Sequence, residues 1–361
     1  MRDRPIRGVL RHQSRTGALL HENRRAPYTA CAVTVDPADP TWFPFDLDLA
    51  AGNARFLRFG AEVLDQSVFL DHRIALVERS PVDVPLASLA IRCATPAWLF
   101  HTSFCCSTLL ARALHANPWV EVLKEPFALR RLADAMHAGH DTGAALSTVV
   151  ALLARPWHEN SRTVIKPTHA ALNLAPALLD ATPGSRAVVL YSGLSDFLVS
   201  NLKKPPQTQE KVGRLAARLA HDAGFDAELL RAAEAAADWP GLVAVQWTAA
   251  IALAQRALRH APSRVIALSD RELLADIPGR VAAVAEWLAL PAPPEHIAAR
   301  AAQAAGRHAK ETDATYDAAQ RAREAEQVRQ HFAVPIEQAM AWARAQCAPL
   351  LGAGPLAAAL R

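Results

Sequence analysis

Residues 98–114 read WLFHTSFCCSTLLARAL, and this stretch decides the fold. An apolar run ends at His101, small and hydroxylic residues follow as far as Thr108, and a helix with apolar spacing comes next. Backbone N–H groups at the start of a helix converge on a ligand, and the helix dipole favours negative charge there. The loop 101–108 is therefore predicted to bind an anion. A plain turn with a serine helix cap is the simpler alternative.

The residues of this loop are mostly small or hydroxylic. We take as candidate cofactor-binding residues Ser103, Phe104, Cys105, Cys106, Ser107 and Thr108. The two adjacent thiols could act as nucleophiles, because a helix N-terminus lowers the pKa of a thiol. The sequence places no histidine beside them, so lining of a tight turn is the more economical interpretation.

Beyond residue 95, short apolar runs alternate with helical stretches, as is typical of a parallel sheet flanked by helices. The runs lack polar alternation, as expected for strands buried on both faces. Strands are expected at 97–101, 120–123, 163–165, 187–191 and 264–268, and helices at 107–115, 127–138, 144–154, 170–180, 195–203, 208–223 and 242–259. The predicted fold class is α/β: a central parallel sheet flanked by helices, with a helical C-terminal part and a small N-terminal lead-in.

Three regions are expected along the chain. Residues 1–28 hold seven arginines and no apolar signal core, which indicates a basic, flexible tail. Residues 29–92 form a lead-in region with enough aromatic side chains to dock onto the rest, and we assign it no chemistry. Residues 93–350 form the main domain, including the C-terminal helices.

Composition narrows the class of protein. The 361 residues are 51% hydrophobic and 20% charged, and no apolar run is expected to approach the roughly 18 residues of a membrane span. Five cysteines without CxxC spacing favour a reducing compartment over a disulfide framework or a zinc site. A net charge of +4 is too small to argue for nucleic acid. Richness in alanine and arginine favours a bacterial cytoplasmic protein, of open oligomeric state.

Lysine is rare in this chain, with six among the 39 basic residues, at 124, 166, 203, 204, 211 and 310. Where arginine has replaced interchangeable surface lysines, those that survive are enriched in places that need a compact ammonium group. Two of them end predicted strands, Lys124 before Glu125-Pro126 and Lys166 before Pro167-Thr168-His169. Ligands of open parallel sheets bind at the carboxyl ends of strands, so this edge is the predicted site. A surface ion pair is the alternative for Lys124 and Glu125.

These motifs, taken in order, resemble those of the sulfotransferase family. The loop and helix start at 101–110 resemble the family's strand, G-x-x-[RK]-S-G-T-T loop and helix. The other resemblances lie at 124–126 (the Lys/Glu-Pro segment), 191–200 (the R-x-P-x-D-x-x-x-S motif), and 264–278 with 284–290 (the late strand, acidic turn and helix). The resemblance spans about residues 95–291.

The resemblance implies a P-loop-like fold that binds 3′-phosphoadenosine 5′-phosphosulfate and transfers its sulfuryl group to a hydroxyl or amine. The acceptor would be a small molecule or a carbohydrate, with neither nucleic acid nor a membrane span involved. Ser192 and Ser200 fall in the 3′-phosphate motif, and Arg307 and Lys310 fall where family members carry a basic loop over the nucleotide.

The chain departs from the family pattern at three positions. Phe104 replaces a basic residue of the loop, Cys106 replaces a glycine, and Ser192 replaces the 3′-phosphate arginine. A β-carbon at Cys106 could obstruct a positive φ angle or the approach of a phosphate. Lys203 and Lys204 could supply the missing charge, whereas the basic stripe at 211, 214 and 218 is better explained as a solvated helix face.

Sulfuryl transfer needs a cradle, a cation for the leaving phosphate and a base for the acceptor. The loop amides with Ser107 and Thr108 would form the cradle, and Lys124 or Lys166 would supply the cation. Glu125 is the first choice for the base and His169 the second. Lys124 and Glu125 are both expected to face solvent, so that substituting them should leave the fold intact.

Two other functions stay open. An ATP-dependent phosphoryl transferase could use a similar loop, although Ser107 stands at the position of the Walker lysine and no G-x-x-x-x-G-K-[ST] motif occurs. A catalytically decayed protein that binds an anion or a partner is the third possibility, supported by the missing cations at Phe104 and Ser192.

Overall fold

A computed structural model describes residues 34–76, 80–204, 209, 211–305 and 318–360, with backbone only for 318–321. The expected basic tail and the two candidates Arg307 and Lys310 lie outside the described residues. From Val35 onward the chain forms one compact unit. All of the features below belong to that unit.

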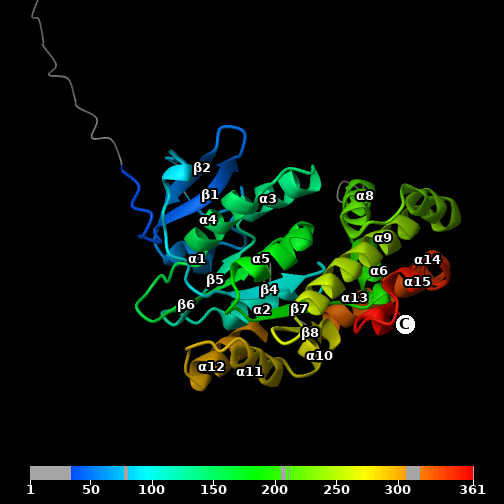
Figure 1. Cartoon of the computed structure of the whole chain (residues 1–361). Helices are drawn as coiled ribbons and strands as arrows, with labels where there is room; N and C mark the ends of the chain where they lie inside the picture. Colours follow the sequence, from blue (N-terminus) through cyan, green and yellow to red (C-terminus); the bar gives the residue numbers. More distant parts are fainter. Residues whose placement is uncertain (1–33, 77–79, 205–208, 210, 306–317, 361) are drawn as a thin grey trace, which may run out of the picture. The chain divides into compact units, whose positions relative to one another are not determined.

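A five-stranded parallel sheet forms the centre of this unit (Figure 1). Its strands are β4 (Ala97–His101), β5 (Val120–Lys124), β6 (Arg162–Lys166), β7 (Ala187–Tyr191) and β8 (Val265–Ser269), in the order β5-β6-β4-β7-β8. In β4, Trp98 and Phe100 enter one buried cluster while Ala97 and Leu99 enter another. The sheet is therefore buried on both faces, which explains why its strands are continuously apolar.

Helices cover both faces of this sheet (Figure 1). One face packs on α3 (Phe127–His137), α4 (Gly143–Leu153), the 3₁₀ turn η2 (His169–Leu174), α5 (Ala175–Ala181) and α9 (Ala227–His260). The other packs on α2 (Ser107–Leu114), α10 (Asp270–Ala275), α11 (Ile277–Trp287) and α12 (Pro294–Ala305). The predicted fold class is confirmed.

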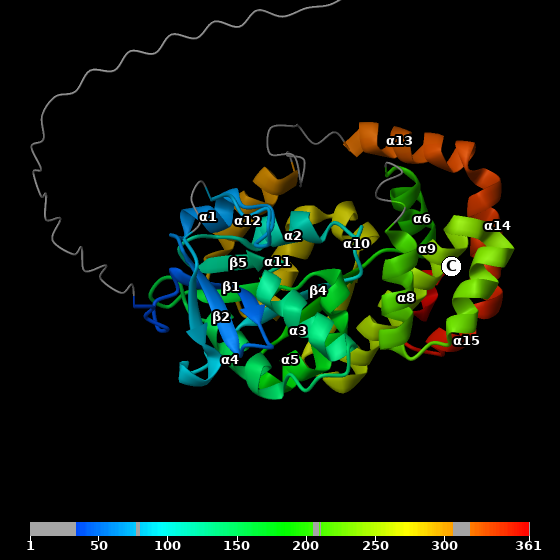
Figure 2. The ribbon, with the colours of Figure 1, turned by 90° about the horizontal axis from the view of Figure 1, so that it is seen from above.

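The N-terminal region forms a small antiparallel sheet rather than an irregular lead-in. It contains β1 (Trp42–Asp48), β2 (Asn53–Arg58) and β3 (Val82–Pro85), with the short α1 (Glu62–Gln66) after β2. β1 packs against α3 and α4 (Figure 2). Its register shifts between Pro44 and Asp46, and this irregularity hides the strand from a pattern search.

The C-terminal part is helical, as predicted. It includes α6 (Leu194–Leu202), α8 (Val212–Ala223), α13 (Ala318–His331), α14 (Ala333–Gln346), α15 (Ala348–Leu351) and η3 (Ala357–Leu360). Helix α13 contacts α6, and α14 contacts α9 (Figure 2).

Helix α9 is longer than the predicted helix at 242–259. It begins at Ala227 and is interrupted at Ala237 and Asp238, whose backbone angles are not helical. By length and composition it could cross a membrane, against the expectation that no apolar run comes close. Its apolar window is 78% buried inside the protein, so packing accounts for its composition.

Candidate functional site

The loop between β4 and α2 has an unusual backbone. Ser103, Phe104 and Cys106 have φ angles of 70°, 50° and 61°, and none of them is glycine. Left-handed backbone costs an L-residue roughly 1–2 kcal/mol, and such strain gathers at ligand sites. The family position of Cys106 is a glycine, yet this cysteine adopts the left-handed conformation (φ 61°, ψ 20°) that glycine favours. Its β-carbon therefore does not prevent the turn.

Helix α2 starts directly after this turn without a side-chain cap. Its N-cap residue is Cys106, which makes no capping hydrogen bond, so the alternative of a serine-capped turn does not describe this helix. The N–H of Ser103 donates to His101 Nδ1 at 3.2 Å. Because Nδ1 accepts this hydrogen bond, the proton of a neutral His101 ring would be on Nε2.

Three hydroxyls at this edge are buried and form no hydrogen bond within the described part of the chain. They belong to Thr102, Ser103 and Ser192, with exposed fractions of 0%, 8% and 0%. Buried polar groups in native proteins are nearly always hydrogen-bonded. Ser103 and Ser192 follow the neighbouring strands β4 and β7, so the sheet brings two of the predicted cofactor-binding residues to one edge.

Glu125 and Lys166 meet at the ends of β5 and β6. Lys166 Nζ donates to Glu125 Oε1 at 2.6 Å, and the Glu125 N–H donates to the Lys166 carbonyl at 2.7 Å. His101 Nε2 lies 3.8 Å from the same Oε1 atom, and the His101 and His169 rings lie 5.9 Å apart. Three of the four predicted catalytic residues, Glu125, Lys166 and His169, are thus gathered around one carboxylate.

The charges around Glu125 change what it can do. Burial alone would raise the pKa of Glu125, but the charge and hydrogen bond of Lys166, with His169 and Arg73, lower it below its usual value. A carboxylate with a lowered pKa is a weak base, because proton affinity falls with pKa. Glu125 is therefore better suited to orienting a donor than to removing a proton, and His169 becomes the stronger candidate for the base.

Lys124 is buried, and the expectation that it faces solvent was wrong. Its side chain is 1% exposed and that of Glu125 is 14% exposed. Burial, reinforced by the charges of Arg112 and Arg300, lowers the pKa of Lys124 to about 8. No described residue accepts a hydrogen bond from its ammonium group. The sequence did not reveal the effect of Arg300 on this pKa because Arg300 lies on a helix 176 residues further along the chain.

The N-terminal region takes part in this edge, although no chemistry was predicted for it. The Leu70 N–H donates to the Lys124 carbonyl at 2.7 Å, and the Phe127 N–H donates to the Leu70 carbonyl at 3.1 Å. The Phe69 ring lies 5.8 Å from Lys166 Nζ and 3.8 Å from the Arg73 guanidinium carbon. The segment around Leu70 thus holds the Lys124-Glu125 turn in place.

The place of the missing basic residue is flanked by a lysine. The Phe104 ring packs edge-on against Phe197, and Lys204 Nζ lies 5.6 Å from the centre of the Phe104 ring. Its neighbour Lys203 instead faces Glu324 at 3.8 Å. Of the two lysines that the sequence offered as substitutes, Lys204 is the one beside the loop.

The other sequence candidates are less closely tied to the loop. Ser200 lies on α6, partly exposed, and Ser192 is held by Trp247, whose Nε1 donates to the Ser192 carbonyl at 2.9 Å. Arg218 belongs to no free basic stripe, because it pairs with Asp134 at 2.5 Å. Ser107 and Thr108 begin α2 with exposed fractions of 7% and 6%.

The thiol interpretation fails for Cys105. Its Sγ lies 3.3 Å from the Leu190 carbonyl, and burial, with Asp270 and Cys106 nearby, raises its pKa to about 12. A thiol with so high a pKa stays protonated and inert at neutral pH. Cys105 therefore lines the turn, as the economical interpretation expected.

Sequence reasoning passed over two residues of the site. His101 was quoted as the end of a strand, and its contact with Glu125 could have been suspected because it ends a strand on the predicted edge. Phe69 belongs to the lead-in region, to which the sequence analysis assigns no chemistry. Nothing in its local sequence indicates a contact with Lys166.

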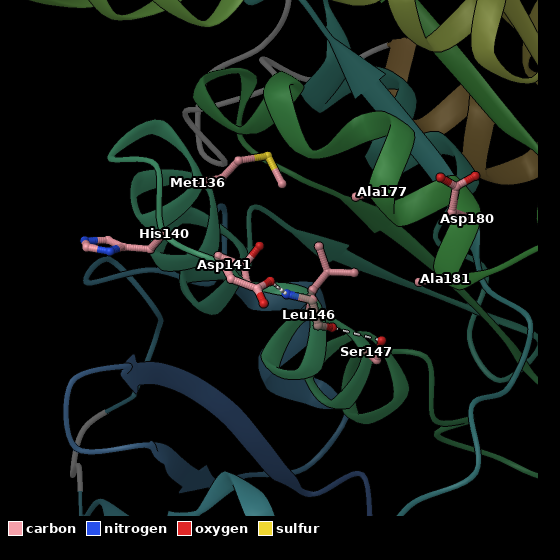
Figure 3. A pocket seen from close by; sticks show the side chains of 10 residues that line it. Met136, His140, Asp141, Leu146, Ser147, Ala177, Asp180 and Ala181 are labelled. Atoms are coloured by element: carbon pink, nitrogen blue, oxygen red, sulfur yellow. Dashed lines mark hydrogen bonds between the residues drawn. The ribbon is translucent and has the colours of Figure 1, made fainter.

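A cavity of about 400 Å³ lies elsewhere, between α3, α4 and α5 (Figure 3). Met136 and Leu146 point into it, and Asp180 lies at its margin. None of the predicted site residues lines it. Because α3 leads away from the carboxyl end of β5, its last turn with Met136 lies far from the loop along the helix.

A scan of protein-family models finds no match to this chain, and a search of curated proteins finds none either. Solved structures do match. The chain is similar in structure to sulfotransferases. A sulfotransferase from Alicyclobacillus acidocaldarius matches at 14% identity and a TM-score of 0.37, over 74% of this chain and 100% of that one.

Two further sulfotransferases are similar. The sulfotransferase domain from the curacin biosynthetic pathway matches at 11% identity and a TM-score of 0.31, covering 67% of this chain and 99% of that one. A sulfotransferase from Mycobacterium tuberculosis H37Rv matches at 15% identity and a TM-score of 0.30, covering 69% and 78%. Likeness this remote says nothing about activity, so a function has to be argued from the loop and its neighbours.

Proposed function

We propose that this chain binds 3′-phosphoadenosine 5′-phosphosulfate at the loop 101–108 and transfers its sulfuryl group to a hydroxyl or amine of an acceptor. The observation that carries the proposal is the loop itself. Three non-glycine residues in left-handed conformation precede an uncapped helix N-terminus, and the buried hydroxyls beside them have no hydrogen-bond partner among the described residues. Strain and unsatisfied donors at a strand-to-helix turn support an anion as the missing partner.

The residues at this edge fit a polyanionic nucleotide in charge and in hydrogen bonding. The amides of the first turn of α2 and the hydroxyls of Ser103 and Ser192 would donate to phosphate oxygens. Lys204, beside Phe104, would supply charge where the family carries a basic loop residue. The bound donor would provide the activated sulfuryl group, and the chain would provide position and charge.

The acceptor proton would go to His169. Glu125, kept ionised by Lys166, would accept a hydrogen bond from a second N–H or O–H group of the acceptor and so orient it. Lys124, buried without a hydrogen-bond acceptor, would be drawn toward negative charge that develops at the edge. These roles keep all four of the predicted catalytic residues and exchange the order of the two candidate bases.

A thermal-shift experiment tests the ligand. We expect adenosine 3′,5′-bisphosphate to raise the melting temperature, by an amount that corresponds to ~2.7 kcal/mol at a hundredfold excess over Kd. ATP with Mg²⁺ and sulfate alone are the comparison ligands. Stabilisation by ATP with Mg²⁺ alone would favour phosphoryl transfer, and stabilisation by none would favour a protein that has lost this activity.

Two adjacent lysines provide a matched pair of variants. Lys204→Met should weaken bisphosphate binding about tenfold, because this lysine lies beside the loop. A tenfold loss corresponds to the free energy that one charge-assisted hydrogen bond usually contributes to binding. Lys203→Met should leave binding unchanged, because this lysine faces Glu324. Equal effects at both positions would mean that only general positive charge matters.

A further inference from the structure

Helices α3 and α8 bring two histidines and an aspartate together at their C-terminal ends. His137 Nδ1 lies 2.6 Å from Asp222 Oδ1, and His221 Nδ1 lies 3.6 Å from the same oxygen. One ligand atom from each residue lies within 4.8 Å of the other two. The cluster belongs to the opposite end of α3 from the Glu125-Pro126 turn, so it is separate from the proposed donor site.

We propose that His137, His221 and Asp222 bind a divalent transition-metal ion of the zinc class. Two imidazole nitrogens and one carboxylate oxygen form a donor set that zinc prefers, with a fourth position left for water. A tetrahedral ion about 2.0–2.1 Å from each donor places the donors roughly 3.3 Å apart. The pair at 2.6 Å has to open and the pair at 3.6 Å has to close slightly, which side-chain rotations can provide because the two histidine side chains are 31% and 70% exposed.

The carboxylate of Asp222 is buried, and its two oxygens face different partners. The Asp222 side chain is 4% exposed, and its Oδ2 atom has no hydrogen bond from any described residue. Arg218 Nε is 3.9 Å from that atom, and Arg218 is itself bound by Asp134. With Oδ1 on a metal, Oδ2 would remain turned toward Arg218, an arrangement that orients a ligating carboxylate.

The backbone adds to the field that favours a cation. His137 is the last residue of α3, and His221 and Asp222 lie in the last turn of α8. The C-terminal end of a helix carries partial negative charge, so two helix ends face the same small volume. Arg256 opposes this effect, because it donates to the carbonyls of Asp222 and Ala223 at 3.2 Å. His137 would keep its proton on Nε2 and offer Nδ1 to the metal.

A metal titration tests the proposal on the whole chain. Protein stripped by a chelator is titrated with Zn²⁺ against a chromophoric competitor, and with Co²⁺ by absorption spectroscopy. We expect one equivalent of Zn²⁺, a four-coordinate Co²⁺ spectrum without a thiolate charge-transfer band, and a rise in melting temperature with Zn²⁺. A thiolate band would assign the metal to cysteines and overturn the proposal, as would the absence of a stoichiometric site.

Two histidine variants sharpen the test. His221→Gln changes a side chain that is 70% exposed, so the fold should persist while Zn²⁺ affinity falls by about 100-fold or more. His260→Gln is the matched control, because His260 makes a hydrogen bond of the same 2.6 Å length to Asp180 without a second histidine. Equal losses in the two variants would contradict the site. Bisphosphate binding should be unchanged in both variants. The metal proposal can therefore be confirmed or contradicted independently of the proposed function.

Discussion

A buried carboxylate lies at each end of strand β5, and the pKa values of the two are shifted in opposite directions. At its carboxyl end, Glu125 accepts a hydrogen bond from Lys166 at 2.6 Å, and the surrounding cations lower its pKa. Near its amino end, Glu121 is fully buried, no described residue makes a hydrogen bond to either carboxylate oxygen, and burial raises its pKa to about 7. His158 Nε2 lies 3.1 Å from Glu121 Oε1, a contact that is ionic only when the imidazole is protonated.

The contrast shows that burial alone does not mark a functional site. Both carboxylates are removed from water, but only Glu125 is kept ionised, by Lys166 on the neighbouring strand together with His169 and Arg73. Glu121 has one partner among the described residues, His158, whose imidazole is uncharged when it is not protonated. The raised pKa of Glu121 favours its protonated form. Ligands of open parallel sheets bind at the carboxyl edge, so groups that are kept ionised there can interact with an anion or with a polar acceptor.

The largest expected effect comes from breaking the ion pair at the carboxyl end. Lys166→Met leaves Glu125 charged and without its partner, which should lower the free energy of unfolding by about 3–5 kcal/mol at pH 7. In the wild type the lowered pKa of Glu125 provides stability at neutral pH that is lost as pH falls through that pKa. The deficit of the variant should therefore shrink in acid. Urea denaturation at pH 7 and pH 4 measures both values.

Two control variants test whether the loss of stability comes from the buried ion pair. Lys203→Met removes a partly exposed lysine with a 3.8 Å ion pair, and should cost less than about 1 kcal/mol. The double variant Lys166→Met/Glu125→Gln should recover part of the loss, because it removes the unpaired charge as well. A deficit at Lys166 as small as that at Lys203 would show that the pair is held too loosely to define a site.

The opposite sign is expected at the amino end. Glu121→Gln removes a carboxyl group whose pKa is raised to about 7, so it should stabilise the protein where the wild-type group is forced to ionise. The native group binds more protons than the unfolded one between its unfolded pKa and 7, and wild-type stability falls with rising pH in that window. The gain should reach about 2–3 kcal/mol at pH 8 and vanish near pH 4. Thermal unfolding across this range measures it, and a gain that does not depend on pH would argue for a packing effect.

The sequence predicted the central sheet well because its strands are continuous apolar runs. The expected strands at 97–101 and 187–191 coincide with β4 and β7, and the other three agree within two residues. β1 was missed because Pro44 and a register shift interrupt its pattern. The first half of α9 was missed because it is separated from the apolar half by a non-helical pair at Ala237 and Asp238.

Several of the candidate residues could be placed at one edge of the sheet from the sequence, but their charge states could not. Rare lysines at strand ends pointed to this edge, since parallel strands align their carboxyl ends. The surroundings of these lysines include residues far away in the chain, such as Phe69, whose ring lies near Lys166, and Arg300, whose charge lowers the pKa of Lys124. The positive φ of 58° at Glu125 runs against the extended backbone that a following proline favours, so no local rule could have indicated it.

A third test restores the cation that the loop lacks. Phe104→Arg should tighten adenosine 3′,5′-bisphosphate binding about tenfold, or ~1.4 kcal/mol, because a guanidinium forks onto phosphate oxygens. Phe104→Leu is the control, since it removes the ring that packs on Phe197 without adding charge. Titration calorimetry distinguishes them. If both variants bind alike, the ring and not the charge governs the loop.

The smallest effect is a fraction of a proton, and it reports on Lys124. Its pKa of about 8 leaves roughly half of the ammonium groups deprotonated at pH 8, and a bound anion favours the charged form. Binding of the bisphosphate should therefore take up close to half a proton at pH 8 and almost none at pH 6.5, where Lys124 is already charged. Calorimetry in two buffers of different ionisation enthalpy measures this uptake.

Lys124→Arg keeps the charge but cannot titrate, so it should bind without proton uptake at either pH. If the uptake is undiminished in this variant, another group takes up the proton and Lys124 is not part of the anion site. Glu121→Gln, at the far end of the same strand, is the control and should leave the uptake unchanged.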